Sequence, residues 1–174
     1  GNLRWSRAST VKVTGWPTCT LSIWVSFMLA ITHSWFGTSA THSEAINGQV
    51  RFVGTFLSTI PFARKYGVLQ SPLELWIENS TICTVASEVP GLADDFNKYL
   101  NANPSNRRVE ELGIGTNEGV KDLYARNAGF EERHCGLHLG LGGGQKGSHH
   151  LDLIFASGVL ALDDKPVFDG AFMF

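Results

Sequence analysis

Apolar and polar residues alternate over short runs along most of the chain, a pattern that predicts β-strands rather than long helices. Runs of this kind lie at 46–56, 73–85 and 159–170. The first run opens on Asn47-Gly48, a dipeptide typical of tight turns. The other two runs are expected to fold as hairpins that turn near 78–80 and 163–166. The pattern therefore favours antiparallel sheets.

One helix is predicted at 91–102, directly after Pro90. Leu92, Phe96 and Leu100 recur there at the spacing of one helical face. We expect this apolar face to pack against a sheet.

The apolar segment 20–31 allows two interpretations. It follows several basic residues, so it resembles the apolar middle of a signal peptide, yet it is too short to span a membrane. Its β-branched and aromatic residues, with small polar residues at intervals, favour one or two strands buried on both faces. We predict strand structure here.

The composition fits one folded domain, because 43% of the 174 residues are hydrophobic and only 17% are charged. The predicted fold class is α+β, a single β-rich domain over 11–174 with mostly antiparallel strands, hairpins and one or two helices. Residues 1–10 are expected to be a flexible N-terminus. A formal charge of -2, with scattered Lys and Arg, argues against nucleic acid or an anionic membrane as a partner.

The three cysteines are Cys19, Cys83 and Cys135, an odd number without C-x-x-C spacing. This argues against a disulfide framework or a thiolate zinc site, and it suits a cytoplasmic location. Cys135 is expected to be a buried, inert thiol.

Four ionisable residues stand out because they lie inside apolar, strand-like sequence. They are Glu111, His138, His150 and Asp152. The three segments that carry them, expected to form successive strands, lie at 109–117, 130–144 and 148–155. Polar groups in such positions need a metal, a ligand or one another as partners. The alternatives are a site for a divalent metal, and a metal-free set of histidines hydrogen-bonded to carboxylates.

The order of several motifs resembles the catalytic, C-terminal domain of the aminopeptidase T-type leucyl aminopeptidases. The motifs are TGWPT (14–18), INGQV (46–50), SPLELWIENS (71–80), ELGIGTN (111–117), GLHLGLG (136–142) and HLD (150–152). Members of that family are cocatalytic metallopeptidases. The resemblance implies their catalytic-domain fold, and it implies that 20–31 belongs to the mature domain.

By this resemblance the family's metal ligands correspond to Glu111, Glu132, His138, His150 and Asp152, with Glu132 one residue out of the family's register. Such a set of imidazoles and carboxylates can hold zinc or another divalent ion. Ring-cleaving dihydroxypyridine dioxygenases share the scaffold and use non-haem iron. By resemblance to them, His138, His150 and Asp152 would form a site for a single iron ion.

Several departures from the family imply a degenerate, truncated enzyme. Thr38 follows the glycine where the family has a metal-binding glutamate, and Gln145 stands near the place of a tyrosine thought to assist catalysis. The chain also begins almost at the catalytic domain, without the family's N-terminal domain. Loss of such groups removes the charge that holds a second ion and the acid-base steps that drive hydrolysis.

These features lead to three hypotheses of function. The first is a non-hydrolytic peptide-binding protein that presents a peptide to a partner enzyme, in the biosynthesis of a peptide-derived natural product. It needs no cofactor, or keeps zinc or iron at a vestigial site. The second is a metal-dependent aminopeptidase or oxygenase that uses His138, His150 and Asp152. The third is a structural subunit whose surface is covered by a second copy or by a partner protein in place of the missing domain.

Overall fold

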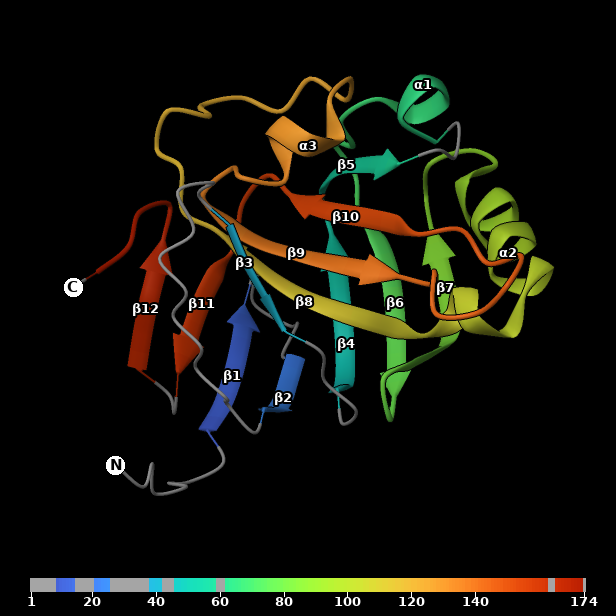
Figure 1. Ribbon diagram of the computed structural model, residues 1–174, viewed down its shortest axis with the longest axis horizontal. Helices are drawn as coiled ribbons and strands as arrows, with labels where there is room; N and C mark the ends of the chain where they lie inside the picture. Colours follow the sequence, from blue (N-terminus) through green and yellow to red (C-terminus); the bar gives the residue numbers. More distant parts are fainter. Residues whose placement is uncertain are drawn as a thin grey trace.

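Two antiparallel β-sheets lie one over the other in the computed structural model, with their strands crossing (Figure 1). The structure describes residues 9–14, 21–25, 38–41, 46–58, 62–162 and 165–173. The seven-stranded sheet has the order β12-β11-β1-β2-β4-β6-β7, and the five-stranded sheet has the order β3-β8-β9-β10-β5. The predicted fold class, α+β with mostly antiparallel strands, is confirmed.

The strands of the seven-stranded sheet are β1 (Ser9–Thr14), β2 (Leu21–Val25), β4 (Ile46–Phe52), β6 (Leu73–Glu78), β7 (Thr81–Ser87), β11 (Val159–Leu162) and β12 (Lys165–Asp169). Those of the five-stranded sheet are β3 (Thr38–Thr41), β5 (Gly54–Ser58), β8 (Val109–Gly115), β9 (Gly136–Leu141) and β10 (Leu151–Phe155). The helices are α1 (Phe62–Tyr66), α2 (Leu92–Ala102), α3 (Ala128–Glu131) and the 3-10 helix η1 (Pro104–Arg107). Within the described residues, no helix has both the length and the apolar composition needed to cross a bilayer.

The apolar core lies between the two sheets and contains residues of both. In β6 the side chains alternate, with Leu73, Leu75 and Ile77 buried, as expected of a strand with one face on a core. In β9 and β10, by contrast, every residue is buried, so both faces of these strands are covered. A polar side chain in β9 or β10 therefore needs a partner inside the protein.

The predicted helix is confirmed as α2. Leu92, Phe96 and Leu100 are all buried, as expected from their spacing, and so is Tyr99. The ring of Phe96 packs on Phe56 of β5, with ring centroids 5.9 Å apart. Helix α2 is thereby fixed to the five-stranded sheet as well as to its neighbour β7.

The predicted strand over 46–56 divides at Val53, and its halves enter different sheets. Gly54 makes this crossing possible, because a Cβ at this position would collide with the backbone oxygen of Ile154 on β10. The amide of Ala156 also donates to the Val53 carbonyl at 3.0 Å, where the chain crosses back from β10 to β11. The chain thus crosses between the two sheets twice at the same place, from β4 to β5 and from β10 to β11.

The turn predicted at Asn47-Gly48 is wrong. Gly48 lies inside β4, paired with Ile77 on β6. The neighbouring turn of the β6–β7 hairpin consists of Asn79 and Ser80, which have φ values of 47° and 58°. The Asn79 amide donates to Asn47 Oδ1 at 2.8 Å. The Asn47 side chain therefore stabilises the turn between β6 and β7, and Asn47 itself forms no turn.

The two predicted hairpins are confirmed as β6–β7 and β11–β12, although 163–164 in the second turn lie outside the described residues. Of the predicted segment 20–31, residues 21–25 form β2, and 26–31 lie outside the described residues. Strand β1 begins at Ser9, within the N-terminal segment expected to be flexible, and 1–8 are not described.

Replacing Gly54 with alanine is expected to destabilise the fold by more than about 2 kcal/mol, because the new methyl group must displace β10 at the crossing. Gly129→Ala in α3 is the matched control, since a Cβ at Gly129 meets nothing within 4 Å. Urea denaturation should give a loss for Gly54→Ala and no loss for Gly129→Ala. Equal midpoints for the two variants would contradict the role of Gly54.

Candidate functional site

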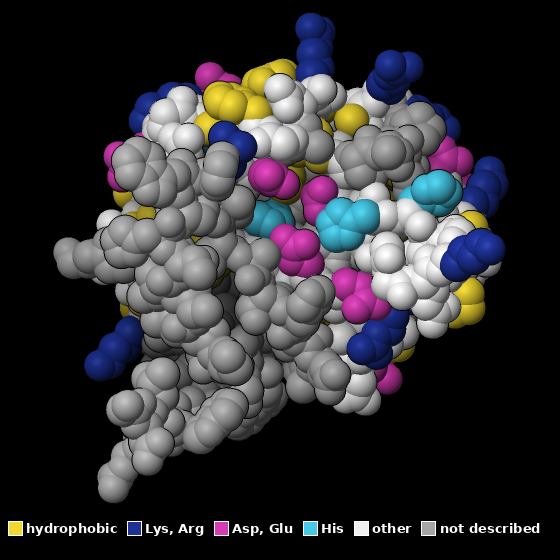
Figure 2. Space-filling view, viewed as in Figure 1, with side chains coloured by type: hydrophobic (Ala, Val, Ile, Leu, Met, Phe, Trp, Pro, Cys, Tyr) yellow, Lys and Arg dark blue, Asp and Glu magenta, His cyan; other side chains and the backbone are white. Residues whose placement is uncertain are grey.

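Histidine and acidic side chains gather on one face of the molecule, over the five-stranded sheet (Figure 2). The four predicted residues belong to this face: Glu111 on β8, His138 on β9, Asp152 on β10, and His150 directly before β10. The antiparallel register brings them together, because Gly140 pairs with both Glu111 and Asp152. We call these four residues and Glu132 the acidic cluster.

Two glycines leave the space that the histidine rings occupy. Gly113 on β8 pairs with His138, and a Cβ there would collide with the imidazole. A Cβ on Gly140 would lie 2.6 Å from Cε1 of His150. The rings therefore lie over bare backbone, which gives a physical reason for the glycines in the ELGIGTN and GLHLGLG motifs. The sequence patterns alone did not identify this role.

The side chains of the cluster bond to one another. Nε2 of His138 lies 3.2 Å from Oε1 of Glu111, and Nε2 of His150 lies 2.7 Å from Oδ1 of Asp152. The second Glu111 oxygen lies 3.8 Å from Nε2 of His150, so Glu111 stands between the two rings. His138 is only 3% exposed, and its buried Nδ1 has no partner among the described residues.

The hydrogen bond to Asp152 raises the pKa of His150 to about 9, against the effect of burial. At neutral pH the ring is therefore an imidazolium, and both nitrogens donate. Nε2 donates to Asp152, and Nδ1 lies 3.4 Å from its acceptor, the Gly142 carbonyl.

Glu132, which the family resemblance also predicted as a ligand, lies close to this network. Burial raises the pKa of its carboxyl group, and the negative charges of Asp152 and Glu111 raise it further. No hydrogen bond joins its side chain to the described residues, and it is half-buried. A bound cation would therefore stabilise the ionised form of Glu132.

The donor types of the cluster suit zinc or iron, but their arrangement does not. Across the described ranges, no three His, Cys, Asp or Glu side chains are placed to hold one ion. Each Nε2 is directed at a carboxylate, and both nitrogens of His150 are engaged. The residues as arranged do not fit a metal, and the metal-binding role stays a prediction.

A buried amide positions the glycine-rich loop that leads to His150. Asn106 is 0% exposed, and its Oδ1 accepts from Ser148 Oγ at 2.7 Å. The Tyr99 hydroxyl donates to the His149 carbonyl at 2.8 Å. Gln145, at the predicted place of the catalytic tyrosine, is exposed on this loop. Sequence reasoning missed Tyr99 and Asn106, because their partners are distant in the chain.

Glu131 organises the segment before β9. It is 0% exposed, and its two carboxylate oxygens accept from four successive amides, those of residues 124–127, at 2.8–2.9 Å. The strand predicted over 130–144 is therefore wrong for its first residues, which end α3 and form a turn, and β9 begins only at Gly136. A buried carboxylate that accepts hydrogen bonds from several successive backbone amides holds a loop rather than a strand.

Two further predictions concern positions near the cluster. Thr38, at the place of the family's missing glutamate, begins β3 and pairs with Gly115 of β8. Cys135 is half-buried rather than fully buried, and Cys83 is exposed. Cys19 lies outside the described residues.

The two-sheet fold is similar to a solved structure, that of 2,5-dihydroxypyridine dioxygenase from Pseudomonas putida KT2440. The TM-score is 0.60 at 13% identity, over 96% of this chain and 55% of that chain. The chain thus spans about half the length of the dioxygenase. This likeness shows the fold alone, and it confirms the scaffold that the sequence resemblance implied.

The sequence matches the family described as crocagin biosynthetic protein CgnE/B over residues 63–162, more than half of the chain. The protein therefore belongs to the crocagin biosynthetic protein CgnE/B family. Crocagin is a peptide natural product, so this membership confirms the predicted link to the biosynthesis of such a compound. No curated protein matches the chain in sequence.

The free energy of unfolding is expected to fall as the pH rises from about 6.5 to about 9, because the proton that His150 holds in the folded state is lost there. The pKa of this group is raised by folding, so its contribution is complete below pH 6.5 and lost through pH 9. Urea denaturation of wild-type protein and His150→Gln at pH 6 to 9 measures it. The exposed neighbour variant His149→Gln should keep the wild-type pH dependence, and a His150→Gln curve parallel to wild type would refute this role.

Glu131→Gln is expected to cost about 2 kcal/mol or more, because an amide cannot accept from four backbone donors. Hydrogen exchange should accelerate at the amides of 124–127. Glu132→Gln, one residue further on, removes a carboxylate without a hydrogen bond to the described residues and should leave both measurements near wild type. Similar exchange rates in the two variants would argue against the anchoring role of Glu131.

Proposed function

We propose that the protein binds a peptide without hydrolysing it and presents this peptide to a partner enzyme in crocagin-type biosynthesis. The acidic cluster receives a protonated amine of the peptide. The observation that carries the proposal is the half-buried carboxylate of Glu132, whose pKa is raised by burial and by Asp152 and Glu111. Family membership supports a peptide as the ligand.

An ammonium group fits this environment better than a metal does. The cluster holds three carboxyl groups against the imidazolium of His150 and the nearby positive charge of Arg133, so acidic groups prevail, which favours a cation. An ammonium donates hydrogen bonds to carboxylate oxygens and leaves the bond between His150 and Asp152 intact. A metal would need a free lone pair on Nε2 of His150, whereas this nitrogen carries a proton that it donates to Asp152.

The lack of hydrolysis is supported by the same contacts. Hydrolysis needs a group that activates water, and Glu111 and Asp152 are held by the two imidazoles. Gln145 is exposed and carries no acid-base group, and a threonine stands at position 38. We infer that the partner enzyme supplies the chemistry, while this protein orients the peptide.

A metal-dependent enzyme is the second candidate, and the donor set of His138, His150 and Asp152 favours it. The similarity to the dioxygenase adds only a shared fold. The third hypothesis, a subunit covered by a second copy or a partner protein, stays a prediction.

Arrays of random hexapeptides, immobilised through their carboxyl ends, test the proposal. We expect binding to a subset of peptides with free amino groups, and about tenfold weaker binding when these amines are acetylated, because one charged contact is lost. Glu132→Gln should lose affinity to a similar extent, because it removes the carboxylate that receives the amine. Mass spectrometry should find the bound peptides uncut.

Glu88→Gln, which removes an exposed carboxylate next to β7, is the matched control and should bind like wild type. Binding that ignores acetylation and Glu132→Gln would contradict the acidic cluster as the site. Cleaved peptides, together with about one metal ion per chain that His150→Ala removes, would favour the metal-dependent enzyme instead.

A further inference from the structure

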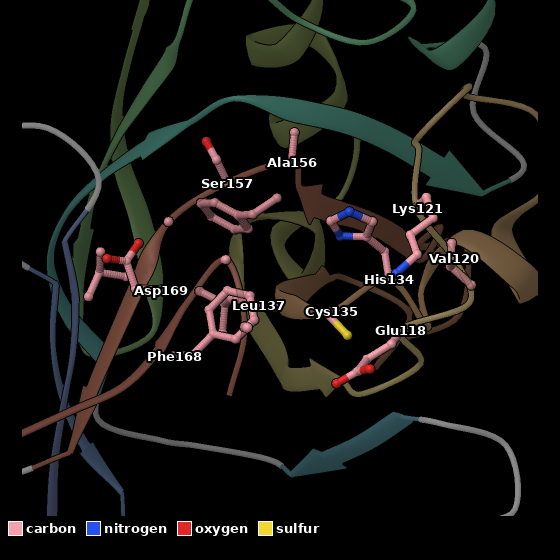
Figure 3. A pocket seen from close by; sticks show the side chains of 16 residues that line it. Glu118, Val120, Lys121, His134, Cys135, Leu137, Ala156, Ser157, Phe168 and Asp169 are labelled. Atoms are coloured by element: carbon pink, nitrogen blue, oxygen red, sulfur yellow. The ribbon is translucent and has the colours of Figure 1, made fainter. Parts of the chain in front are cut away.

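A cavity of about 580 Å³ opens at the edge of the space between the two sheets, near the start of β9 (Figure 3). Its walls come from the loop at 118–121, the approach to β9 and the ends of β10 and β12. It lies on the other face of the sheet from the acidic cluster, because Leu137 lines the cavity and the next residue, His138, belongs to the cluster. None of the cluster residues lines it.

Part of the cavity suits an apolar ring. Val120, Leu137, Phe155 and Phe168 form apolar walls, and the charged residues Glu118, Lys121 and Asp169 also line the cavity. Several glycines and alanines complete the lining. The volume falls within the range of about 300–1,000 Å³ that is typical of small-ligand sites.

One lining residue, His134, carries a polar atom without a partner among the described residues. Its Nδ1 is buried and makes no hydrogen bond to the described residues, so a small rotation of the ring is needed to present this nitrogen to a ligand in the cavity. Burial lowers the pKa of His134, so the ring is neutral at pH 7. Because either tautomer is then accessible, a hydroxyl group, which both donates and accepts, satisfies this nitrogen in both forms. Leaving it unpaired costs free energy that a ligand hydroxyl would recover.

We propose that this cavity binds a phenol-type side chain, with the hydroxyl on His134 and the ring between Leu137 and Phe168. The identification of the natural occupant as a side chain of a peptide rests on the proposed function. The chemistry of the cavity stands on its lining alone.

Two cysteines allow a direct test with an internal control. Cys135 lines the cavity and is half-buried, whereas Cys83 on β7 is exposed and lies outside it. N-acetyl-tyrosine amide is the probe, and N-acetyl-phenylalanine amide is its match without the hydroxyl. Both lack an amine, so neither can use the acidic cluster. The rate of alkylation by iodoacetamide at each cysteine is followed by mass spectrometry.

The tyrosine probe should slow alkylation of Cys135 and leave Cys83 unchanged. The phenylalanine probe should need about tenfold higher concentration for the same protection, because it leaves Nδ1 of His134 unpaired. His134→Leu should remove this difference between the probes. No protection of Cys135, equal slowing at Cys83, or equal potency of the two probes on wild type would overturn the proposal.

Ser157→Trp separates this proposal from the proposed function. Ser157 is an exposed rim residue, so tryptophan there should block the mouth without disturbing the core, and Glu88→Trp is the control away from the cavity. Ser157→Trp should abolish protection by the tyrosine probe and weaken binding to tyrosine-containing array peptides about tenfold.

The outcomes distinguish the two claims. If Glu132→Gln weakens peptide binding and Ser157→Trp does not, the acidic cluster stands and the cavity is not a peptide subsite, which overturns this inference. If Cys135 is protected by the tyrosine probe but no array peptide binds, the chemistry of the cavity is supported and only the proposed function fails.

Discussion

The register of β8, β9 and β10 is the constraint on which the site depends. It pairs Gly113 with His138 and places Gly140 between Glu111 and Asp152, so that each imidazole has room over a glycine. A slip by one residue would turn the charged side chains into the core and the leucines outward. Since β9 and β10 are buried on both faces, such a slip has no low-energy outcome. The same leucines that build the core therefore fix the geometry of the acidic cluster.

The electrostatic properties of the acidic cluster follow from the charges of its side chains. Glu111 and Asp152 are each satisfied by an imidazole, and the bond to Asp152 keeps His150 charged. Glu132 adds a carboxylate for which the described residues offer no hydrogen bond. In this arrangement the histidines act as hydrogen-bond donors to carboxylates, whereas a metal ligand must offer a free nitrogen lone pair. This is the physical basis on which we propose an ammonium group rather than a metal as the cation.

Local patterns in the sequence were sufficient for much of this structure and insufficient at identifiable points. The alternation in 73–85 and the spacing of Leu92, Phe96 and Leu100 are local signals, and both elements form as predicted. The sequence also indicated that Glu111, His138, His150 and Asp152 meet. It failed at Asn47-Gly48, because pairing with strands far along the chain overrides a local turn preference. It failed at Glu131 for a similar reason, since nothing in the sequence distinguishes a carboxylate that collects buried amides from one that faces solvent.

The segment from Glu131 to His138 joins the two faces of the five-stranded sheet. Glu131 fixes the amides of 124–127, which follow the cavity-lining residues 118–121 in the chain, while the next residue, Glu132, lies at the acidic cluster. His134 and Leu137 then line the cavity, and His138 returns to the cluster. The two sites lie on opposite faces of the five-stranded sheet, so a peptide that occupies both has to pass around the end of β9 where the strand begins. Such two-point attachment would fix the orientation of the peptide as well as its position. Orientation is what a protein that presents a peptide to another enzyme must supply.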